Sequence, residues 1–273
     1  MTILEAIEKR RSVRTFDGAP LRGDDAMRIL EFAQKTENPF GLPIEWMLLG
    51  AARDGHSAPV ITGADTYIAG KLRRGPRAEE AFGYAFERIV LYAQTLGIGT
   101  TWIAGTMDRP AFERAIGLSE GEVMPCVSPL GYPAARMSVR ETMMRKGVRA
   151  NSRLPFEELF FDGTFDSPLT PERAGALRTM LEAVRLAPSA VNRQPWRVAV
   201  CSGTAHFYEK RSRGMADGGW DIQRIDMGIA LCHFALAAEA CGLPLRMTTE
   251  DPRIPGAEGL EYVASWVSQQ GAD

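Results

Sequence analysis

Apolar residues recur along this chain at the spacings of helices and of strands. Ile3, Leu4 and Ile7 form one apolar stripe at helical spacing, and the pattern Thr2-x-x-Glu5 is a capping box that predicts where this first helix begins. The same reasoning predicts further helices at residues 25–35, 81–96, 172–186 and 226–241, and strands at residues 44–50, 59–69, 127–132 and 197–201. Helices therefore alternate with short strands through the whole chain.

Part of this pattern occurs twice. The stretch Phe16-Asp-Gly-Ala-Pro-Leu returns as Phe165-Asp-Ser-Pro-Leu, one residue shorter. Each copy is followed by an amphipathic helix and, further on, by a long apolar helix that ends in glycine. Chance likeness between helices explains the helices, but it does not explain the repeated Phe-Asp…Pro-Leu. We therefore predict two related half-domains, residues 1–150 and residues 151–273, that form one compact unit.

Composition narrows the class of protein. The 273 residues are 45% hydrophobic and 24% charged, as in ordinary soluble globular proteins, and the net charge of −2 argues against a nucleic-acid or membrane-surface binder. The chain opens without a signal-peptide pattern, and its longest apolar run is too short to span a bilayer, so we predict a cytoplasmic protein. The spacing of the four cysteines and three histidines predicts no metal site and fits a reducing compartment.

A basic segment follows the first helix. Arg10, Arg11, Ser12 and Arg14 bring guanidinium groups to both sides of a hydroxyl, a combination that suits a phosphate. Cations at a helix C-terminus are also expected from the helix dipole alone, so a purely structural role remains open at this point.

A second polar segment, Ala-Pro-Ser-Ala-Val-Asn-Arg-Gln-Pro-Trp at residues 187–196, lies between a predicted helix and a predicted strand. Pro188 ends the helix, and a second proline launches the strand. Ser189, Asn192 and Gln194 lie between them, and short polar side chains on a rigid loop suit a planar heterocycle. An ordinary helix-to-strand loop would have the same composition.

This polar segment resembles the flavin-facing loop of the nitroreductase family, which comprises FMN-dependent NAD(P)H oxidoreductases. The basic segment resembles the family's N-terminal motif, whose basic residues and serine hold the FMN phosphate and the pyrimidine edge. The glycine segment Leu96-Gly-Ile-Gly-x-x-Trp-Ile resembles the family segment whose backbone amide faces flavin N5, here the amide of Ala104 or Gly105. The tyrosine segment Gly131-Tyr-Pro-Ala-Ala-Arg136 resembles a signature in which a basic residue reaches the phosphate. Residues 137–153 are strongly basic, and we interpret most of them as a solvated linker.

The resemblance covers essentially the whole chain and implies an α+β nitroreductase-like fold. It implies two pseudo-symmetric half-domains, each with a mainly antiparallel sheet flanked by helices, and long central helices at their interface. Aligned on the repeat, the phosphate positions become Leu159, Phe161 and Gly163 in the second copy, and the loop positions become Asn38, Gly41 and Pro43 in the first. Each copy lacks what the other retains, so we predict a fused pseudo-dimer that acts as a monomer with one flavin site. The predicted FMN-binding residues are Arg10, Arg11, Ser12, Arg14, Ile103, Ala104, Gly105, Arg136, Pro188, Ser189, Ala190, Asn192 and Gln194.

The implied activity is hydride transfer from NADH or NADPH to flavin N5 and then to a small aromatic or quinone-like electron acceptor. No side chain is expected to act as a catalytic acid or base, and Arg14 is expected to stabilise negative charge on the flavin. A non-catalytic flavin store or redox sensor, or a dehalogenase or flavin-destroying relative on the same fold, are the alternatives. The loop at residues 211–220, a candidate for substrate selection, carries no recognisable signature.

Overall fold

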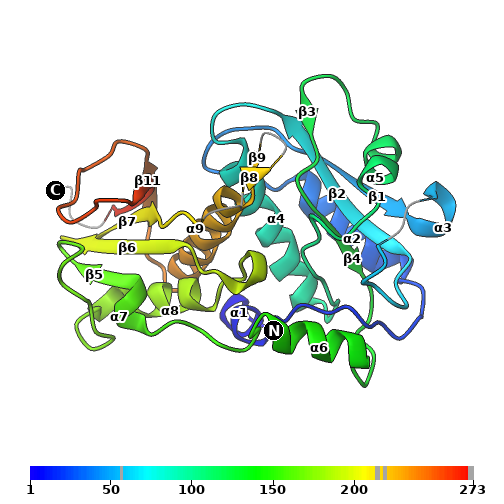
Figure 1. The fold of residues 1–273 in the computed structure, drawn as a ribbon, viewed down its shortest axis with the longest axis horizontal. Coiled ribbons are helices and arrows are strands. Elements are labelled where there is room, and N and C mark those ends of the chain that lie inside the picture. The colour runs from blue at the N-terminus through cyan, green and yellow to red at the C-terminus, as the bar shows by residue number, and fades with distance from the viewer. Residues whose placement is uncertain (56–57, 213–215, 218–219, 270–273) are drawn as a thin grey trace. The chain divides into compact units, whose positions relative to one another are not determined.

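The structure is a computed structural model, and it describes residues 1–55, 58–212, 216–217 and 220–269 (Figure 1). The chain divides into two compact units, Met1–Ala150 and Asn151–Asp273, here called unit 1 and unit 2. Each unit has its own sheet and its own helices. The fold is thus built from helices and mainly antiparallel sheets, as the sequence predicts.

The sheet of unit 1 is built around a buried central strand. Its strands are β1 (Glu45–Gly50), β2 (Thr66–Arg73), β3 (Glu122–Val123) and β4 (Val127–Leu130). β2 pairs antiparallel with β1 along one edge and with β3 and β4 along the other. Residues 67–72 of β2 are all buried, because both of its edges are paired and both of its faces are covered.

The helices of unit 1 are α1 (Ile3–Lys9), α2 (Gly23–Gln34), α3 (Ala51–Asp54), α4 (Ala78–Thr95), α5 (Arg109–Ile116) and α6 (Val139–Gly147). The capping box predicted at the start of α1 is present, since Thr2 and Glu5 exchange side-chain to backbone hydrogen bonds. Along α4, Phe82 and Phe86 pack on Trp46 of β1 with ring centroids 5.5 and 5.4 Å apart. These contacts fix α4 against the sheet.

Unit 2 contains a five-stranded sheet in the order β10-β11-β7-β6-β5. Its strands are β5 (Phe160–Asp162), β6 (Trp196–Cys201), β7 (Thr204–Glu209), β10 (Leu245–Thr248) and β11 (Glu261–Ser268). β5 pairs with β6 in parallel, and the other neighbouring strands described in this sheet run antiparallel. Figure 1 shows β6 and β7 side by side in yellow, joined by a tight turn.

The α-helices of unit 2 are α7 (Phe156–Leu159), α8 (Arg178–Leu186) and α9 (Ile222–Ala240), and its short elements are η1 (Gly175–Leu177), η2 (Ala190–Asn192), β8 (Ala216–Asp217) and β9 (Trp220–Asp221).

The two long helices, α4 and α9, end in the same way. Gly97 and Gly242 both have positive φ, and in each case the next residue donates its amide back to the last turn, to Ala93 or to Ala238. This is the Schellman motif, which glycine favours because it has no Cβ.

Three predicted elements differ from the structure. The strand expected at residues 59–69 begins only at Thr66, because the chain first turns through Gly63, whose φ is +81°. The helix expected at residues 172–186 begins at Arg178, because Gly175 has a φ of +54° and interrupts the α-helical backbone. The stretch interpreted as a solvated linker contains α6, which Ser138 caps. The remaining predicted helices and strands are confirmed within a few residues.

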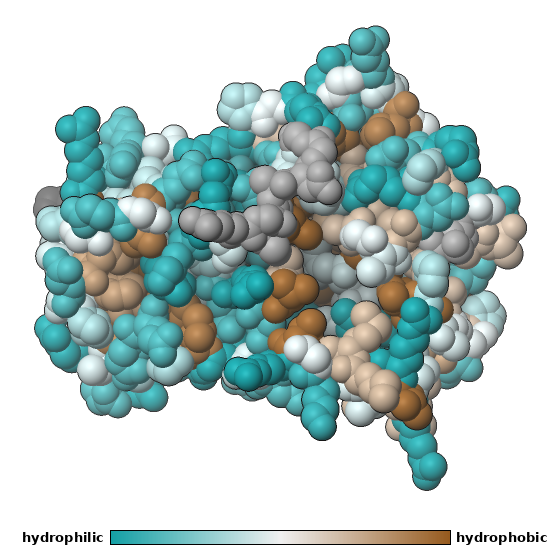
Figure 2. Space-filling model, viewed as in Figure 1, coloured by the Kyte–Doolittle hydropathy of each residue, from teal (hydrophilic) through white to brown (hydrophobic). Residues whose placement is uncertain are grey.

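Hydrophilic residues cover most of the face shown in Figure 2, with apolar residues scattered among them. The large apolar side chains that are exposed in the described part of the chain are Met1, Met27, Met137, Val139, Met143 and Val191. Among the described helices, none combines the length and the apolar character that crossing a bilayer requires.

Candidate functional site

Three segments singled out in the sequence come together in unit 1. In the basic segment, Val13 donates its amide to Thr100 of the glycine segment at 2.8 Å. Gly99 of the glycine segment donates to Gly131 of the tyrosine segment, also at 2.8 Å. Phe16 forms an antiparallel bridge with the tyrosine segment and so closes the arrangement. Residues about 85 and 120 positions apart in the sequence are thereby fixed side by side through their backbones.

Glycines permit this close approach. A Cβ at Gly99 would lie 3.0 Å from Val13 Cγ2, and a Cβ at Gly131 would lie 2.8 Å from Phe16 Cδ1. Gly63 is more restricted, because a Cβ there would lie 2.5 Å from the Phe16 carbonyl oxygen. Any larger residue at these positions would push the basic segment away from its neighbours.

Arg10 of the basic segment is buried beside a carboxylate. Its side chain is 5% exposed, and its Nε lies 3.8 Å from Oε1 of Glu87 on α4, which is fully buried. Glu87 in turn accepts a hydrogen bond from Trp102 Nε1 at 2.8 Å. Burial lowers the pKa of Arg10, while the Glu87 carboxylate opposes this and Arg145 lowers the pKa further. Arg10 Nε has no hydrogen-bond partner among the described residues, so this buried donor is available to a ligand.

α6 contributes further charge to the basic segment. Arg145 Nη1 donates to the Ser12 carbonyl at 3.4 Å, and Arg11 Nη1 lies 3.3 Å from Oε1 of the buried Glu141. Burial lowers the pKa of Arg14; Glu141 opposes this shift, and Arg145 adds to it. Arg145 therefore belongs to the same cluster of cations as the arginines predicted from the sequence. We define the guanidinium cluster as Arg10, Arg11, Arg14 and Arg145.

Arg145 is not predicted from the sequence, because residues 137–153 have the basic composition of a solvated linker. A signal was present, since Ser138-x-x-Glu141 has the spacing of a capping box. Ser138 does cap the helix by accepting the Glu141 amide at 3.1 Å. Arg145 follows Glu141 by one helical turn and so lies on the same face of α6.

The predicted N5-facing segment is held by one arginine. Ile103 exchanges two backbone hydrogen bonds with Val127, at 2.9 and 3.0 Å. Beyond it, Arg109 donates to the Ala104 carbonyl at 2.9 Å and to two carbonyls just before β4 at 2.7 and 3.0 Å. The Ala104 and Gly105 amides have no recorded hydrogen-bond partner in the described part of the chain. Arg109, which the sequence analysis did not single out, thus orients a segment with two available donors.

Arg136 lies on an exposed bend of the tyrosine segment, just before α6. The segment itself is anchored, because the Tyr132 hydroxyl donates to Asp25 at 2.7 Å and accepts from Arg22 Nε at 2.8 Å. No ion pair of Arg136 is recorded with the described residues. The structure therefore places Arg136 at the surface of unit 1 on a fixed backbone.

In unit 2, the polar segment forms the connection from α8 to β6, as predicted. Its backbone includes the short helix η2 and three residues with positive φ: Val191 at 44°, Asn192 at 58° and Gln194 at 51°. Only a few per cent of residues other than glycine adopt this region, and a β-branched residue there is an outlier. The connection is therefore a specific, strained conformation.

The three polar side chains of this loop hold it in place. Ser189 Oγ accepts the Gln194 amide at 2.9 Å, and Gln194 Oε1 accepts the Leu154 amide at 2.9 Å. Asn192 Nδ2 donates to the Ser152 carbonyl at 3.0 Å. Gln194 is only 4% exposed and also donates through Nε2 to the Asn192 carbonyl at 3.3 Å. These side chains, predicted as ligand contacts, are thus engaged in fixing the loop.

The positions that correspond to the phosphate motif in the second copy carry no anion-binding side chain. Leu159 is fully buried, and Phe161 packs edge-on against Phe165 with ring centroids 5.1 Å apart. In the first copy, Asn38 forms a local turn by accepting the amides of Phe40 and Leu42. Leu159 and Phe161 therefore pack within unit 2, and Asn38 stabilises a turn within unit 1.

Residues 2–238 match the family model described as "Putative TM nitroreductase". The chain belongs to this nitroreductase family. It is therefore a nitroreductase-family oxidoreductase, as the motifs of the sequence predict. No curated protein matches its sequence.

Several solved structures are similar to this chain or to part of it. A structure described as a "putative nitroreductase" from Thermotoga maritima is 23% identical, covers 98% of this chain and 94% of its own, and has a TM-score of 0.64. An FMN-dependent nitroreductase from Clostridium difficile is 16% identical over 52% of this chain and 94% of its own, with a TM-score of 0.42. A nitroreductase family protein from Clostridium novyi is 20% identical over 50% of this chain and 87% of its own, also with a TM-score of 0.42. The first of these establishes the nitroreductase-like fold.

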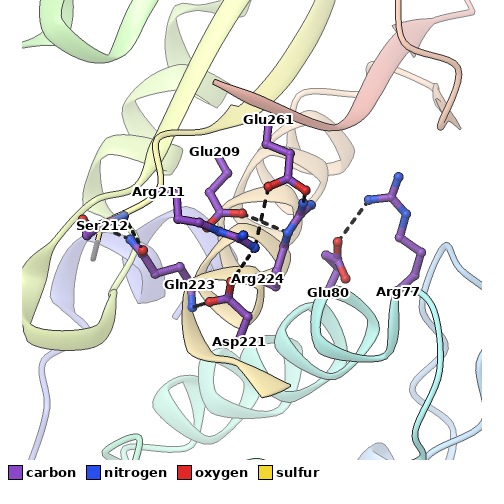
Figure 3. Close-up of polar contacts among 9 residues, drawn as sticks. All are labelled: Arg77, Glu80, Glu209, Arg211, Ser212, Asp221, Gln223, Arg224 and Glu261. Carbon is purple, nitrogen blue, oxygen red and sulfur yellow. Dashed lines mark hydrogen bonds and ion pairs between the residues drawn. The ribbon is translucent and has the colours of Figure 1, made fainter. Parts of the chain in front are cut away.

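Unit 2 of this nitroreductase-family chain also contains a charged network around the buried Glu209 (Figure 3). Glu209 at the end of β7 lies 2.9 Å from Arg224 Nε and 3.8 Å from Arg211 Nε. Arg211 also binds Asp221 at 2.8 Å, and Arg224 contacts Glu261. Burial raises the pKa of Glu209 to about 7, which Arg224 opposes. The network adjoins the loop at residues 211–220, of which residues 213–215 and 218–219 lie outside the described residues.

Proposed function

We propose that this chain is an FMN-dependent oxidoreductase that takes its electrons from NADH or NADPH. The observation that carries the proposal is the guanidinium cluster of unit 1. Three of its four arginines lie on the basic segment, which pairs with the glycine segment directly before the available Ala104 and Gly105 amides. A concentration of arginines suits a phosphate, and available amides suit a heterocycle that accepts hydrogen bonds. Membership of the nitroreductase family supports FMN among the ligands that combine the two.

The residues present fit the phosphate of FMN. Arg10 has a buried Nε without a hydrogen-bond partner among the described residues, and an anion would satisfy it. We propose that Arg10, Ser12 and Arg136 bind the phosphate, with Arg11 and Arg145 adding positive charge. Glu87 and Glu141 partly neutralise the cluster, which limits the repulsion between arginines before a ligand binds.

We propose that the remaining predicted residues bind the ring. Arg14 would place a positive charge near the pyrimidine edge, and the amide of Ala104 or Gly105, beside Ile103, would donate to N5. The loop of unit 2 would cover the ring through Pro188, Ser189, Ala190, Asn192 and Gln194. When bound, FMN supplies the redox chemistry, accepting a hydride at N5 and passing electrons to a small aromatic or quinone-like acceptor. The residues of this chain then orient the ring and stabilise its negative charge, and no side chain needs to act as an acid or base.

Anaerobic reduction tests this proposal. The purified full chain is loaded with FMN, and the visible flavin absorption is followed after NADH or NADPH is added in the absence of oxygen. Prompt bleaching supports the oxidoreductase. A chain that retains FMN but is not bleached by either nucleotide would instead be a flavin store or sensor. A chain that takes up no FMN would refute the proposal altogether.

We also propose that a single chain acts as a pseudo-dimer with one flavin. The phosphate motif occurs only in unit 1 and the polar loop only in unit 2, so each unit supplies a different part of the predicted set. Sedimentation of the FMN-loaded protein tests this directly. A monomer that carries one FMN supports the proposal, and either an obligate dimer or binding of two FMN per chain contradicts it.

A further inference from the structure

The loop that we assign to the flavin ring is strained at its exposed tip. Val191 has a φ of +44°, and its side chain is 56% exposed, so burial of that side chain does not stabilise the conformation. Asn192 and Gln194 share the left-handed backbone region. A strained backbone conformation persists only where surrounding contacts hold it in place, and such conformations are common at functional sites. The contacts that hold this loop therefore bear on what the loop does.

One of these contacts comes from α9. The Ala190 amide donates to both carboxyl oxygens of Asp226, at 3.0 and 3.1 Å. Ala190 is the first residue of η2, whose N-cap, Ser189, makes no side-chain capping bond of its own. Asp226 therefore does from another helix what a capping side chain does locally, and it does so directly before the strained Val191.

A buried carboxyl group such as that of Asp226 lowers the stability of the fold unless its hydrogen bonds compensate for the loss of water. Asp226 is 3% exposed, and burial raises its pKa well above the ordinary value; the Ala190 amide opposes this shift, while Glu209 and Asp221 add to it. An apolar side chain at this position would avoid the cost of burying a carboxyl group. What an apolar side chain could not supply is an acceptor for the Ala190 amide.

We propose that Asp226 is a positioning residue: by accepting the Ala190 amide, it holds residues 189–194 in the one conformation that clasps the flavin. The flavin-binding part of this inference rests on the proposed function, whereas the anchoring of the loop by Asp226 does not depend on it. Asp226 is assigned no contact with the ligand, and it acts through the loop. Its acceptor role requires an oxygen at this position rather than a charge.

Two substitutions separate the acceptor from the charge. Asp226→Ala removes the acceptor, whereas Asp226→Asn retains one oxygen and has nearly the same shape. Asp221→Ala is the matched control, because Asp221 is a carboxylate at the N-terminus of the same helix and accepts the Gln223 amide instead. In the FMN-free full chain, hydrogen exchange of the peptide covering residues 187–196 should be about tenfold faster in Asp226→Ala, the effect of one lost hydrogen bond. Asp226→Asn and Asp221→Ala should leave exchange in this peptide near the wild-type rate.

The second measurement uses the flavin. At saturating FMN, the visible circular dichroism of the bound ring should change in Asp226→Ala and be restored in Asp226→Asn, with an FMN Kd about tenfold higher for the alanine variant alone. Wild-type exchange in Asp226→Ala, or an asparagine variant as impaired as the alanine variant, would overturn the inference. If the alanine variant does not fold, hydrogen exchange of the Ala190 amide in the wild type serves as the test. Protection of this amide supports the inference, and an unprotected amide would overturn the inference. Failure of the wild type to bind FMN, with the loop exchange as expected, would contradict the proposed function and leave the anchoring role supported.

Discussion

Replacing Arg10 by alanine would remove the most buried guanidinium of the cluster. Its side chain is 5% exposed and lies 3.8 Å from the fully buried Glu87, and its Nε has no hydrogen-bond partner among the described residues. We therefore expect two separable effects. One is a loss of FMN affinity, because a phosphate contact disappears. The other is a loss of stability, because the buried Glu87 carboxylate loses the Arg10 guanidinium beside it.

The two magnitudes follow from the geometry. A hydrogen bond between charged groups contributes about 1.5–3 kcal/mol, which corresponds to a Kd for FMN that is about 10–150 times higher. The ion pair is long, with 3.8 Å between Arg10 Nε and Glu87 Oε1, so we place the loss of stability at the lower end of the range for broken buried pairs, about 3 kcal/mol. Arg10→Ala combined with Glu87→Gln should restore most of the stability without restoring affinity.

The assay compares FMN with riboflavin, which has the same ring but no phosphate. Flavin fluorescence quenching gives Kd for both ligands, and urea unfolding gives the stability of each variant. Arg28→Ala serves as the control, since Arg28 is an exposed arginine of α2 outside the cluster. We expect Arg10→Ala to weaken FMN binding while riboflavin binding stays nearly the same. An unchanged FMN Kd in the folded variant, or an equal loss for both ligands, would refute the assignment of Arg10 to the phosphate.

Three further expectations follow from other residues. Arg145→Ala should raise the Kd for FMN about tenfold, as measured by titration, and the increase should be smaller at high salt. Lys146→Ala on the same helix should leave the Kd unchanged. Burial raises the pKa of Glu209 from 4.5 to about 7, so folding favours the protonated carboxyl group. This preference adds up to about 3 kcal/mol to the free energy of unfolding. The full amount is present below pH 4.5, and it is lost as the pH rises through about 7. Urea unfolding between these pH values should therefore show a steeper fall in stability for the wild type than for Glu209→Gln, and equal slopes would contradict the buried carboxyl. Gly131→Ala should lower the free energy of unfolding by about 1–3 kcal/mol, because its Cβ would lie 2.8 Å from a ring carbon, while Gly147→Ala, which meets nothing within 4 Å, should not.

Local patterns determined most of the secondary structure. Thr2 and Glu5 form the predicted capping box, and Pro188 ends the predicted helix directly before the loop. These features could be predicted because each depends on residues a few positions apart. The same holds for the glycine that ends each long helix. The proposal that the two units are copies of one half-domain stays a prediction.

The errors arise where tertiary context overrides local pattern. Gly175 adopts a positive φ, which a glycine permits but does not require, so the late start of α8 could not be deduced from spacing. α6 was overlooked because its basic composition outweighed the cap at Ser138. Its buried face carries Glu141, whose partner Arg11 lies 130 positions away in the sequence. Contacts at that separation cannot be deduced from periodicity.

The candidate site shows the same division. The basic, glycine and tyrosine segments were identified from sequence, and the structure brings them together in unit 1. Arg145 and Asp226 are not predicted from the sequence, because each contacts a segment remote from itself, 133 and 36 positions away. Arg109 is not predicted because it acts through side-chain to backbone hydrogen bonds, which the hydrophobic pattern does not show. The FMN contacts predicted for Pro188, Ser189, Ala190, Asn192 and Gln194 stay predictions. What the structure adds is how each segment is held in position.

The central claim is that one chain holds one FMN, with its phosphate bound by the arginines of unit 1. The measurement that tests it most directly is an equilibrium titration of the purified full chain with FMN, followed by sedimentation of the product. We predict saturation at one FMN per chain on a monomer, together with much weaker binding of riboflavin. No uptake of FMN, or saturation at two FMN per chain, would contradict the account.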